Sequence, residues 1–215
     1  MKKIAIIISG CGVYDGTEIH EATLSMLAID QLGAKYEIFA PNINQHHVIN
    51  HINGNVLNET RNVLVESARI ARGNISDLKD FNSKYFDALL IPGGFGAAKN
   101  LSSYAFDGAN MTVNKEVENA IKSMHSENKP IGALCIAPVL FAKIFSDSNI
   151  TIGNDAATAS LIKEMGAKHT DCNATGIVVD EKNKLISTPC YMLGKSISEV
   201  YEGAFKLVKE LIKLS

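Results

Sequence analysis

The residues with the clearest capacity for chemistry surround Cys135. An apolar run, residues 131–134, leads directly into this cysteine, and a helix-compatible stretch, residues 137–144, follows it. A nucleophile on a sharp strand-to-helix turn has this pattern, because the turn exposes the side chain above the sheet. Positive charge and free N–H groups at a helix N-terminus favour a thiolate, so we expect a lowered thiol pKa. The alternative is a small buried residue at a strand end.

A glycine-rich turn follows another apolar run, residues 88–91. It reads Pro-Gly-Gly-Phe-Gly over residues 92–96. Glycines at a strand end let backbone N–H groups converge on an anion. The turn lacks the ending of a phosphate-binding P-loop and the spacing of a dinucleotide fingerprint. We interpret it as an oxyanion hole, with an ordinary tight turn as the alternative. The candidate oxyanion or substrate-binding residues are Gly93, Gly94, Phe95 and, after the cysteine, Ile136.

Acidic side chains follow the first predicted strand. Glu18 and Glu21 stand three residues apart near the start of a predicted helix, so they share one helix face, whereas His20 points elsewhere. Ligands of parallel sheets bind beyond the carboxyl ends of the strands, where this helix start, the glycine turn and Cys135 all lie. A carboxylate against the thiol there can share its proton in a coupled titration. The alternative for Glu18 is a solvated acid that complements the helix dipole.

Weaker candidates lie near the same strand ends. Cys11 follows the first strand, and Cys190 and Tyr191 follow the last. Either cysteine can be a bystander or an oxidation-sensitive neighbour of the site. A histidine cluster lacks any accompanying carboxylate or cysteine pattern, so we predict no metal site. Its members are His46, His47 and His51.

Strands and helices alternate along most of the chain, and this alternation positions the candidate residues. The predicted strands are residues 4–9, 36–40, 88–91, 131–134, 177–179 and 185–188, and the predicted helices are 17–32, 113–124, 137–144, 156–165 and 196–214. The pattern predicts an α/β three-layer sandwich, a mostly parallel sheet with helices on both faces. The last two strands flank a hairpin-like turn. We predict one domain over residues 1–215, with an insertion at about 41–87 that contains a helix at about 58–71.

Bulk composition excludes several classes of function. The 215 residues are 46% hydrophobic and 20% charged, with a formal net charge of −2. This globular composition offers no attraction to nucleic acid or anionic membranes. The apolar runs are too short to span a bilayer, and the N-terminal run is too short for a signal peptide. We therefore expect a cytoplasmic protein whose four cysteines are free thiols.

These motifs resemble the ThiJ/PfpI superfamily, which has the class I glutamine amidotransferase-like, or flavodoxin-like, fold. Within it the chain is similar to the ElbB-type group, whose members have been called sigma cross-reacting proteins and isoprenoid biosynthesis proteins with an amidotransferase-like domain. The likeness covers essentially the whole chain. It is carried by residues 9–16, 18–21, 58–64, 92–101, 135–138 and 188–193. It implies a cofactor-free glyoxalase that converts glyoxal to glycolate, and a homodimer.

The resemblance also implies roles for individual residues. Cys135 matches the nucleophile, Glu21 the acid that approaches it, and Gly93 and Gly94 the turn on the oxyanion side. The catalytic histidine of many relatives does not carry over, because Ile136 follows the cysteine. The His-x-Glu of amidotransferases is also missing, since the late strand ends in Thr-Pro-Cys-Tyr at residues 188–191. Glutamine hydrolysis is therefore disfavoured.

The predicted function is a glutathione-independent glyoxalase, a lyase that acts on a small dicarbonyl substrate. The Cys135 thiolate adds to an aldehyde, Glu21 moves protons, and water releases glycolate. No cofactor, metal, nucleic acid or membrane partner is predicted. One alternative is another thiol-dependent enzyme, such as an amidotransferase-like accessory protein of isoprenoid metabolism, a deglycase or a hydrolase. The other is a redox-sensing protein without enzymatic activity that uses the same cysteine.

Overall fold

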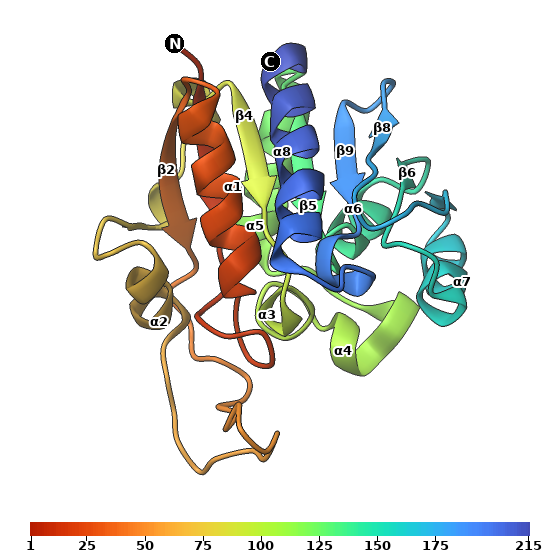
Figure 1. Cartoon of the computed structure of the whole chain (residues 1–215). Helices are drawn as coiled ribbons and strands as arrows, with labels where there is room; N and C mark the ends of the chain where they lie inside the picture. The colour runs from red at the N-terminus through yellow and green to blue at the C-terminus, as the bar shows by residue number, and fades with distance from the viewer.

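A seven-stranded sheet runs through the centre of the computed structural model, which describes residues 1–215 (Figure 1). The strand order is β3-β2-β1-β4-β5-β9-β8, and all neighbours are parallel except β8 and β9. The strands are β1 (Lys3–Ile7), β2 (Lys35–Ala40), β3 (Ser76–Asp77), β4 (Ala88–Ile91), β5 (Ile131–Leu134), β8 (Val178–Asp180) and β9 (Leu185–Thr188). A separate pair consists of β6 (Asn149–Ile150) and β7 (Lys168–His169). The predicted mostly parallel sheet and its antiparallel last pair are confirmed.

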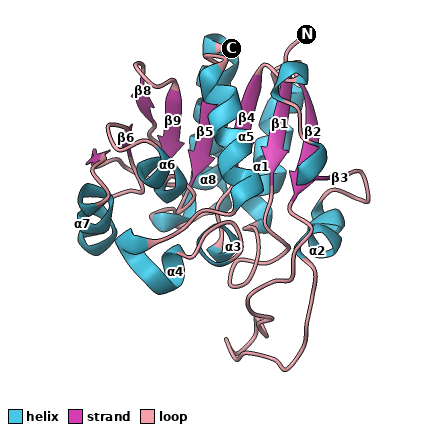
Figure 2. Ribbon diagram, turned by 180° about the vertical axis from the view of Figure 1, so that it is seen from behind, coloured by secondary structure: helices cyan, strands magenta, loops and turns pink.

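Helices cover both faces of this sheet, which confirms the predicted three-layer sandwich (Figures 1 and 2). The helices are α1 (Ile19–Gln31), α2 (Val63–Ile70), α3 (Phe95–Lys99), α4 (Tyr104–Asp107), α5 (Lys115–Ser126), α6 (Val139–Ile144), α7 (Ala156–Glu164) and α8 (Ile197–Leu214). α1 and α8 lie side by side on one face, and α5 and α6 lie on the other. Successive strand side chains serve opposite faces, so Ile4 and Ile6 pack with α1 and α8, whereas Ala5 and Ile7 pack with α5 and α6.

The carboxyl ends of the central strands form the lower edge of the sheet in Figure 1. The short helices α3 and α4 lie beyond this edge, and the loop before α2 extends from the same end. Both chain termini lie at the opposite edge. No helix combines the length and the apolar character needed to cross a membrane.

The short elements differ most from the sequence predictions. α2 begins after Asn62, whose side chain accepts the Val65 N–H, rather than at residue 58. α6 begins at Val139 rather than at residue 137, because residues 135–138 form successive turns. α3 and α4 were not predicted, since they are too short to display a helical period. Residues 41–87 contain α2 and also β3, which extends the main sheet at its edge.

Candidate active site

Cys135 occupies the tight turn that ends β5. Its φ is 60°, a left-handed conformation that residues with a side chain rarely adopt. The Cys135 N–H donates to the Thr188 carbonyl of β9 at 2.9 Å, so the strained residue remains attached to the sheet. The side chain lines a cavity, and the residue is 7% exposed. The turn therefore has the geometry expected of a nucleophile elbow.

The fully buried Glu21 side chain reaches the thiol from the first turn of α1. Its Oε2 accepts the Gly93 N–H at 2.9 Å, and its Oε1 accepts the Tyr191 N–H at 3.1 Å. The Cys135 sulfur lies beside the same carboxyl group, since a Cβ built on Gly93 would be 3.0 Å from the sulfur and 2.7 Å from Oε2. The segments that follow β4, β5 and β9 thus each supply one neighbour of this carboxyl group.

Two residues around this contact set its geometry. A Cβ on Gly93 would lie 2.4 Å from the Cys135 Cβ and 2.7 Å from Glu21 Oε2, so only glycine leaves room for the pair. Glu18 is the N-cap of α1, and its carboxylate accepts the Glu21 N–H at 2.7 Å. The Glu18 N–H donates to the Gly93 carbonyl at 2.9 Å. Glu18 is 8% exposed, so it is a buried cap and not the solvated acid that was the alternative.

The buried carboxyl group of Glu21 favours its neutral form. Burial, followed by the charge of Glu18, raises the pKa of Glu21 to about 8. The N–H groups of Tyr191 and Gly93 act in the opposite direction, because they stabilise the carboxylate. At neutral pH most Glu21 side chains therefore hold a proton.

The prediction of a lowered thiol pKa is wrong. Burial, followed by the charge of Glu21, raises the pKa of Cys135 well above its ordinary value. Hydrogen bonds from the N–H groups of Gly94 and Ile136 to the sulfur oppose this shift without overcoming it. The physical reason is that the thiolate would be buried away from water beside a second acidic group, and two N–H donors do not offset that cost. The thiol and the carboxyl group instead titrate as a coupled pair.

The partners of the backbone N–H groups reduce the predicted set of oxyanion residues from four to two. The N–H groups of Gly94 and Ile136 point at the Cys135 sulfur. The Gly93 N–H already donates to Glu21, and the Phe95 N–H donates to the Val13 carbonyl at 2.7 Å. Gly94 and Ile136 are therefore the two N–H donors that face the reacting position.

A cavity of about 360 Å³ opens above the thiol. It is enclosed by the first connection, the short helices α3 and α4, the elbow, α7 and the segment after β9. The lining residues are Val13, Glu18, Gly94, Phe95, Ala98, Tyr104, Ala105, Cys135, Ile136, Thr158, Tyr191 and Met192. The structure thus brings together the predicted residues Cys135, Glu21, Gly93, Gly94, Phe95, Ile136, Glu18 and Tyr191.

One polar pair beside the cavity was missed, although the sequence analysis named both residues. His20 Nδ1 and the Tyr191 hydroxyl form a hydrogen bond of 2.8 Å, across 171 residues of sequence. Tyr191 lines the cavity, and its backbone N–H also binds Glu21. The helical spacing correctly separated His20 from the face of Glu21, but it could not indicate that Tyr191 would lie beside that histidine.

Other candidate residues lie outside the cavity. Cys11 is half-buried, and burial, followed by the charge of Glu66, raises its pKa. Cys190 is fully buried, and its Sγ lies 3.7 Å from the Val200 carbonyl oxygen. No group of three His, Cys, Asp or Glu side chains is arranged to hold a metal ion. The three predicted cluster histidines instead stack on other rings: His46 on Phe106, His51 on Tyr14, and His47 against His46.

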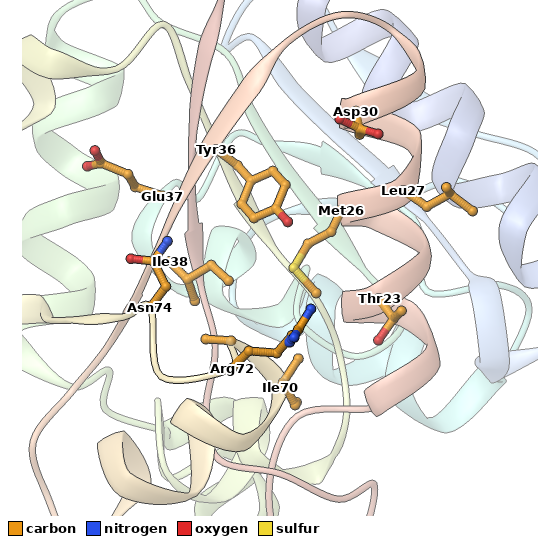
Figure 3. Close-up of a pocket in the computed structure, with 11 residues that line it drawn as sticks. Thr23, Met26, Leu27, Asp30, Tyr36, Glu37, Ile38, Ile70, Arg72 and Asn74 are labelled. Atoms are coloured by element: carbon orange, nitrogen blue, oxygen red, sulfur yellow. The ribbon is translucent and has the colours of Figure 1, made fainter.

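A second cavity, of about 470 Å³, lies between α1, β2 and the end of α2 (Figure 3). Met26 and Tyr36 approach each other across it, with Arg72 beside them. Its lining contains no cysteine or histidine, and its charged groups are Asp30, Glu37 and Arg72. This cavity therefore lacks a thiol and an imidazole, and the candidate active site is the cavity beside Cys135.

Comparisons with known proteins agree with this geometry. The chain is 45% identical to the rat "ES1 protein homolog, mitochondrial", over 99% of this chain and 84% of that protein. It is also 45% identical to the human "Glutamine amidotransferase-like class 1 domain-containing protein 3, mitochondrial", over 99% and 83%. The crystal structure of an isoprenoid biosynthesis protein with an amidotransferase-like domain from Ehrlichia chaffeensis superposes with a TM-score of 0.91. That protein is 39% identical, with 98% of this chain and 99% of the other covered.

The profile of the DJ-1/PfpI family matches residues 12–190, a span that runs from the first connection to the turn after β9. This span contains Glu21, the glycine turn and the cysteine elbow. The predicted superfamily and fold are therefore confirmed, and the chain belongs to the DJ-1/PfpI family.

Proposed function

We propose that the chain is a cofactor-independent glyoxalase that converts glyoxal to glycolate. The observation that carries this proposal is the position of the buried Glu21 carboxyl group beside the Cys135 thiol, which lines the cavity. A thiol supplies a nucleophile for an aldehyde, and a carboxyl group with a pKa of about 8 can both accept and donate a proton near neutral pH.

The reaction proceeds by proton transfers within one covalent adduct. The Cys135 sulfur adds to one aldehyde carbon, and the resulting oxyanion takes up a proton to give a hemithioacetal. Glu21 removes the C–H proton from that carbon, and a proton is delivered to the second carbonyl carbon. The first carbon becomes a thioester as the second is reduced to an alcohol. Water then hydrolyses the thioester, which gives glycolate and regenerates the thiol, so no external oxidant or reductant is consumed.

Neighbouring groups stabilise the charges that move in this sequence. The N–H groups of Gly94 and Ile136 stabilise negative charge as it passes from the sulfur to the hemithioacetal oxygen. The Tyr191 hydroxyl, held by His20, is a second proton donor on the cavity wall. In this scheme the Tyr191 hydroxyl takes the place of the histidine that directly follows the cysteine in many relatives, where this chain has Ile136.

An amidotransferase role is the second candidate, because two relatives carry "amidotransferase-like" in their names. Glutaminases of this fold use a histidine as the general base for their cysteine. No histidine lines the cavity that contains Cys135, and His20 is connected to it only through Tyr191. The glyoxalase scheme requires no such base, so we favour it. The cytoplasmic location and the homodimer are part of this proposal, although both mammalian relatives are named mitochondrial.

The test is an assay of the purified protein with a panel of small dicarbonyls, with glycolate quantified by chromatography. We expect glycolate formation that iodoacetamide abolishes and that Cys135→Ser lowers at least about 10³-fold. Cys172→Ser is the matched control, because Cys172 is a half-buried free thiol outside the cavity. Full turnover by Cys135→Ser, or glutaminase activity without turnover of any dicarbonyl, contradicts the proposal.

A further inference from the structure

The cavity above Cys135 is much larger than glyoxal. Its volume is about 360 Å³, whereas glyoxal has four non-hydrogen atoms and fills on the order of 100 Å³, if each atom occupies about the volume of one water. Roughly 250 Å³ therefore remains beyond the two reacting carbons, which is space for about eight further non-hydrogen atoms. A site built for glyoxal alone has no use for this space.

The surplus space is apolar. Nine of the twelve lining residues are hydrophobic, and they include Phe95, Ala98 and Met192. The end formed by α4 and α7 is lined by Tyr104, Ala105 and Thr158. That end therefore offers no charged side chain to a ligand. Apolar walls of this kind bind alkyl or aryl groups, because such groups leave water on binding.

The polar groups gather at the opposite end, around the thiol. The Glu18 carboxylate binds the Glu21 N–H, and the Tyr191 hydroxyl binds His20. No lysine or arginine lines the cavity, so Glu18 is its only fixed charge. A negatively charged substituent would meet repulsion from Glu18 and no cation to balance it. The lining thus selects for a neutral ligand.

We propose that the preferred substrate is a neutral 2-oxoaldehyde with an alkyl or aryl substituent of about five to eight carbons. This inference rests on the proposed glyoxalase function and names the substrate class of that site. The aldehyde carbon bonds to the Cys135 sulfur, and the substituent extends along Phe95 and Met192 towards Ala105 of α4. The aldehyde C–H proton leaves through Glu21, and a proton is delivered to the ketone carbon. Hydrolysis of the thioester by one water gives a 2-hydroxy acid and the free thiol.

Kinetics with a homologous series test this substrate class. We expect kcat/KM for 2-oxooctanal and for phenylglyoxal to exceed that for glyoxal by tenfold or more, with methylglyoxal between them. Addition of a para-carboxylate to phenylglyoxal should lower kcat/KM at least tenfold. A kcat/KM for glyoxal that equals or exceeds that for 2-oxooctanal overturns this inference and leaves the glyoxalase proposal intact. Absence of turnover with every member of the series overturns both.

A pair of variants on α4 locates the substituent. Ala105 is an exposed residue of α4 that also lines the cavity. The larger side chain of Ala105→Phe should therefore fill the apolar end with little disturbance of the core. It should lower the ratio of kcat/KM for 2-oxooctanal to that for glyoxal at least tenfold. Asp107→Phe adds the same ring to the same helix outside the cavity, and it should leave that ratio unchanged. Equal ratios for the two variants, with unchanged circular dichroism spectra, overturn the assignment.

Discussion

Two adjacent strands, β5 and β9, each end close to a cysteine, and the two thiols differ in their surroundings. The backbone is left-handed at both, with φ of 60° at Cys135 and 44° at Cys190. For each thiol, burial, followed by the charge of Glu21, raises the pKa well above the ordinary value of a cysteine. Both residues belong to the apolar cluster beneath α1 and α8, but Cys135 also lines the cavity, whereas Cys190 is fully buried.

The comparison shows that neither a strained backbone nor a perturbed pKa distinguishes Cys135, the proposed nucleophile, from Cys190. What distinguishes Cys135 is what faces its sulfur: two backbone N–H groups, a carboxyl group and open space. The Cys190 sulfur faces the Val200 carbonyl oxygen, which repels a thiolate rather than stabilising it. Five experiments can break or sharpen this contrast.

Removal of the carboxyl group should have the largest effect. Glu21→Gln cannot accept and return the C–H proton, so we expect kcat/KM for glyoxal to fall about 10³-fold. In the wild type, kcat/KM should rise with pH up to about 8, because loss of the shared proton produces the reactive form. A variant that retains more than a tenth of the activity would show that the carboxyl group only supports the turn.

The same variant also tests the direction of the Glu21 pKa shift through stability. The folded pKa of about 8 lies above the ordinary value of 4.5, so between these values the folded protein holds a proton that the unfolded chain has lost. This group's contribution to stability is therefore lost as pH rises from about 5 to 8. The urea-unfolding free energy of Glu21→Gln, relative to wild type, should improve over this range by on the order of 2–4 kcal/mol. Parallel curves would contradict the raised pKa.

Alkylation compares the two thiols directly. Iodoacetamide should modify Cys135 at least about 100-fold faster than Cys190, because only the Cys135 sulfur has access and N–H donors. The rate at Cys135 should increase as pH rises through 8, and peptide mass spectrometry measures both sites. In urea the two rates should converge, which serves as the control. Equal rates in the folded protein would remove the distinction between the two strand ends.

The polar pair on the cavity wall should have a moderate effect. Tyr191→Phe removes the hydroxyl but retains the N–H that binds Glu21, so we expect a loss of about tenfold in kcat/KM. His20→Gln should cost about threefold, since it leaves the hydroxyl in place without its partner. If the two losses in the double variant simply multiply, the two groups act independently, and the hydrogen bond between them does not contribute to turnover.

The smallest effect on turnover should come from Cys190 itself. Cys190→Ala removes a buried sulfur from the cluster beneath α8 and should cost about 1 kcal/mol of unfolding free energy. We expect kcat/KM for glyoxal to change less than about twofold, because Cys190 does not line the cavity and its sulfur lies against the Val200 carbonyl oxygen. A large loss of activity in a stably folded variant would assign Cys190 a direct role.

The sequence predicted the features that depend on local pattern. Continuous apolar runs mark β4 and β5, and a cysteine or paired glycines directly after such a run mark the strand ends that meet at one edge. The acid Glu21 followed from the resemblance and from its place on α1. The five residues of α3 and the four of α4 left no periodic signal, although they wall the cavity.

Features that depend on long-range contact were beyond prediction. The direction of the thiol pKa shift depends on how deeply Cys135 is buried and on the Glu21 carboxyl group beside it, and residues 131–138 indicate neither. The hydrogen bond between His20 and Tyr191 arises only when β9 ends beside the start of α1. The N–H groups of Gly93 and Phe95 look equivalent to that of Gly94 in the sequence, but the folded loops give them other partners.

The two chain ends lie at the edge of the sheet opposite the Cys135 cavity, and this arrangement has a practical consequence. An affinity tag, a fluorescent fusion or an immobilisation linker attached at either end starts a full strand length away from the thiol. Protein anchored to a sensor surface through either end therefore presents the mouth of the cavity to the solution, so reagents can be flowed over it without cleaving the linker.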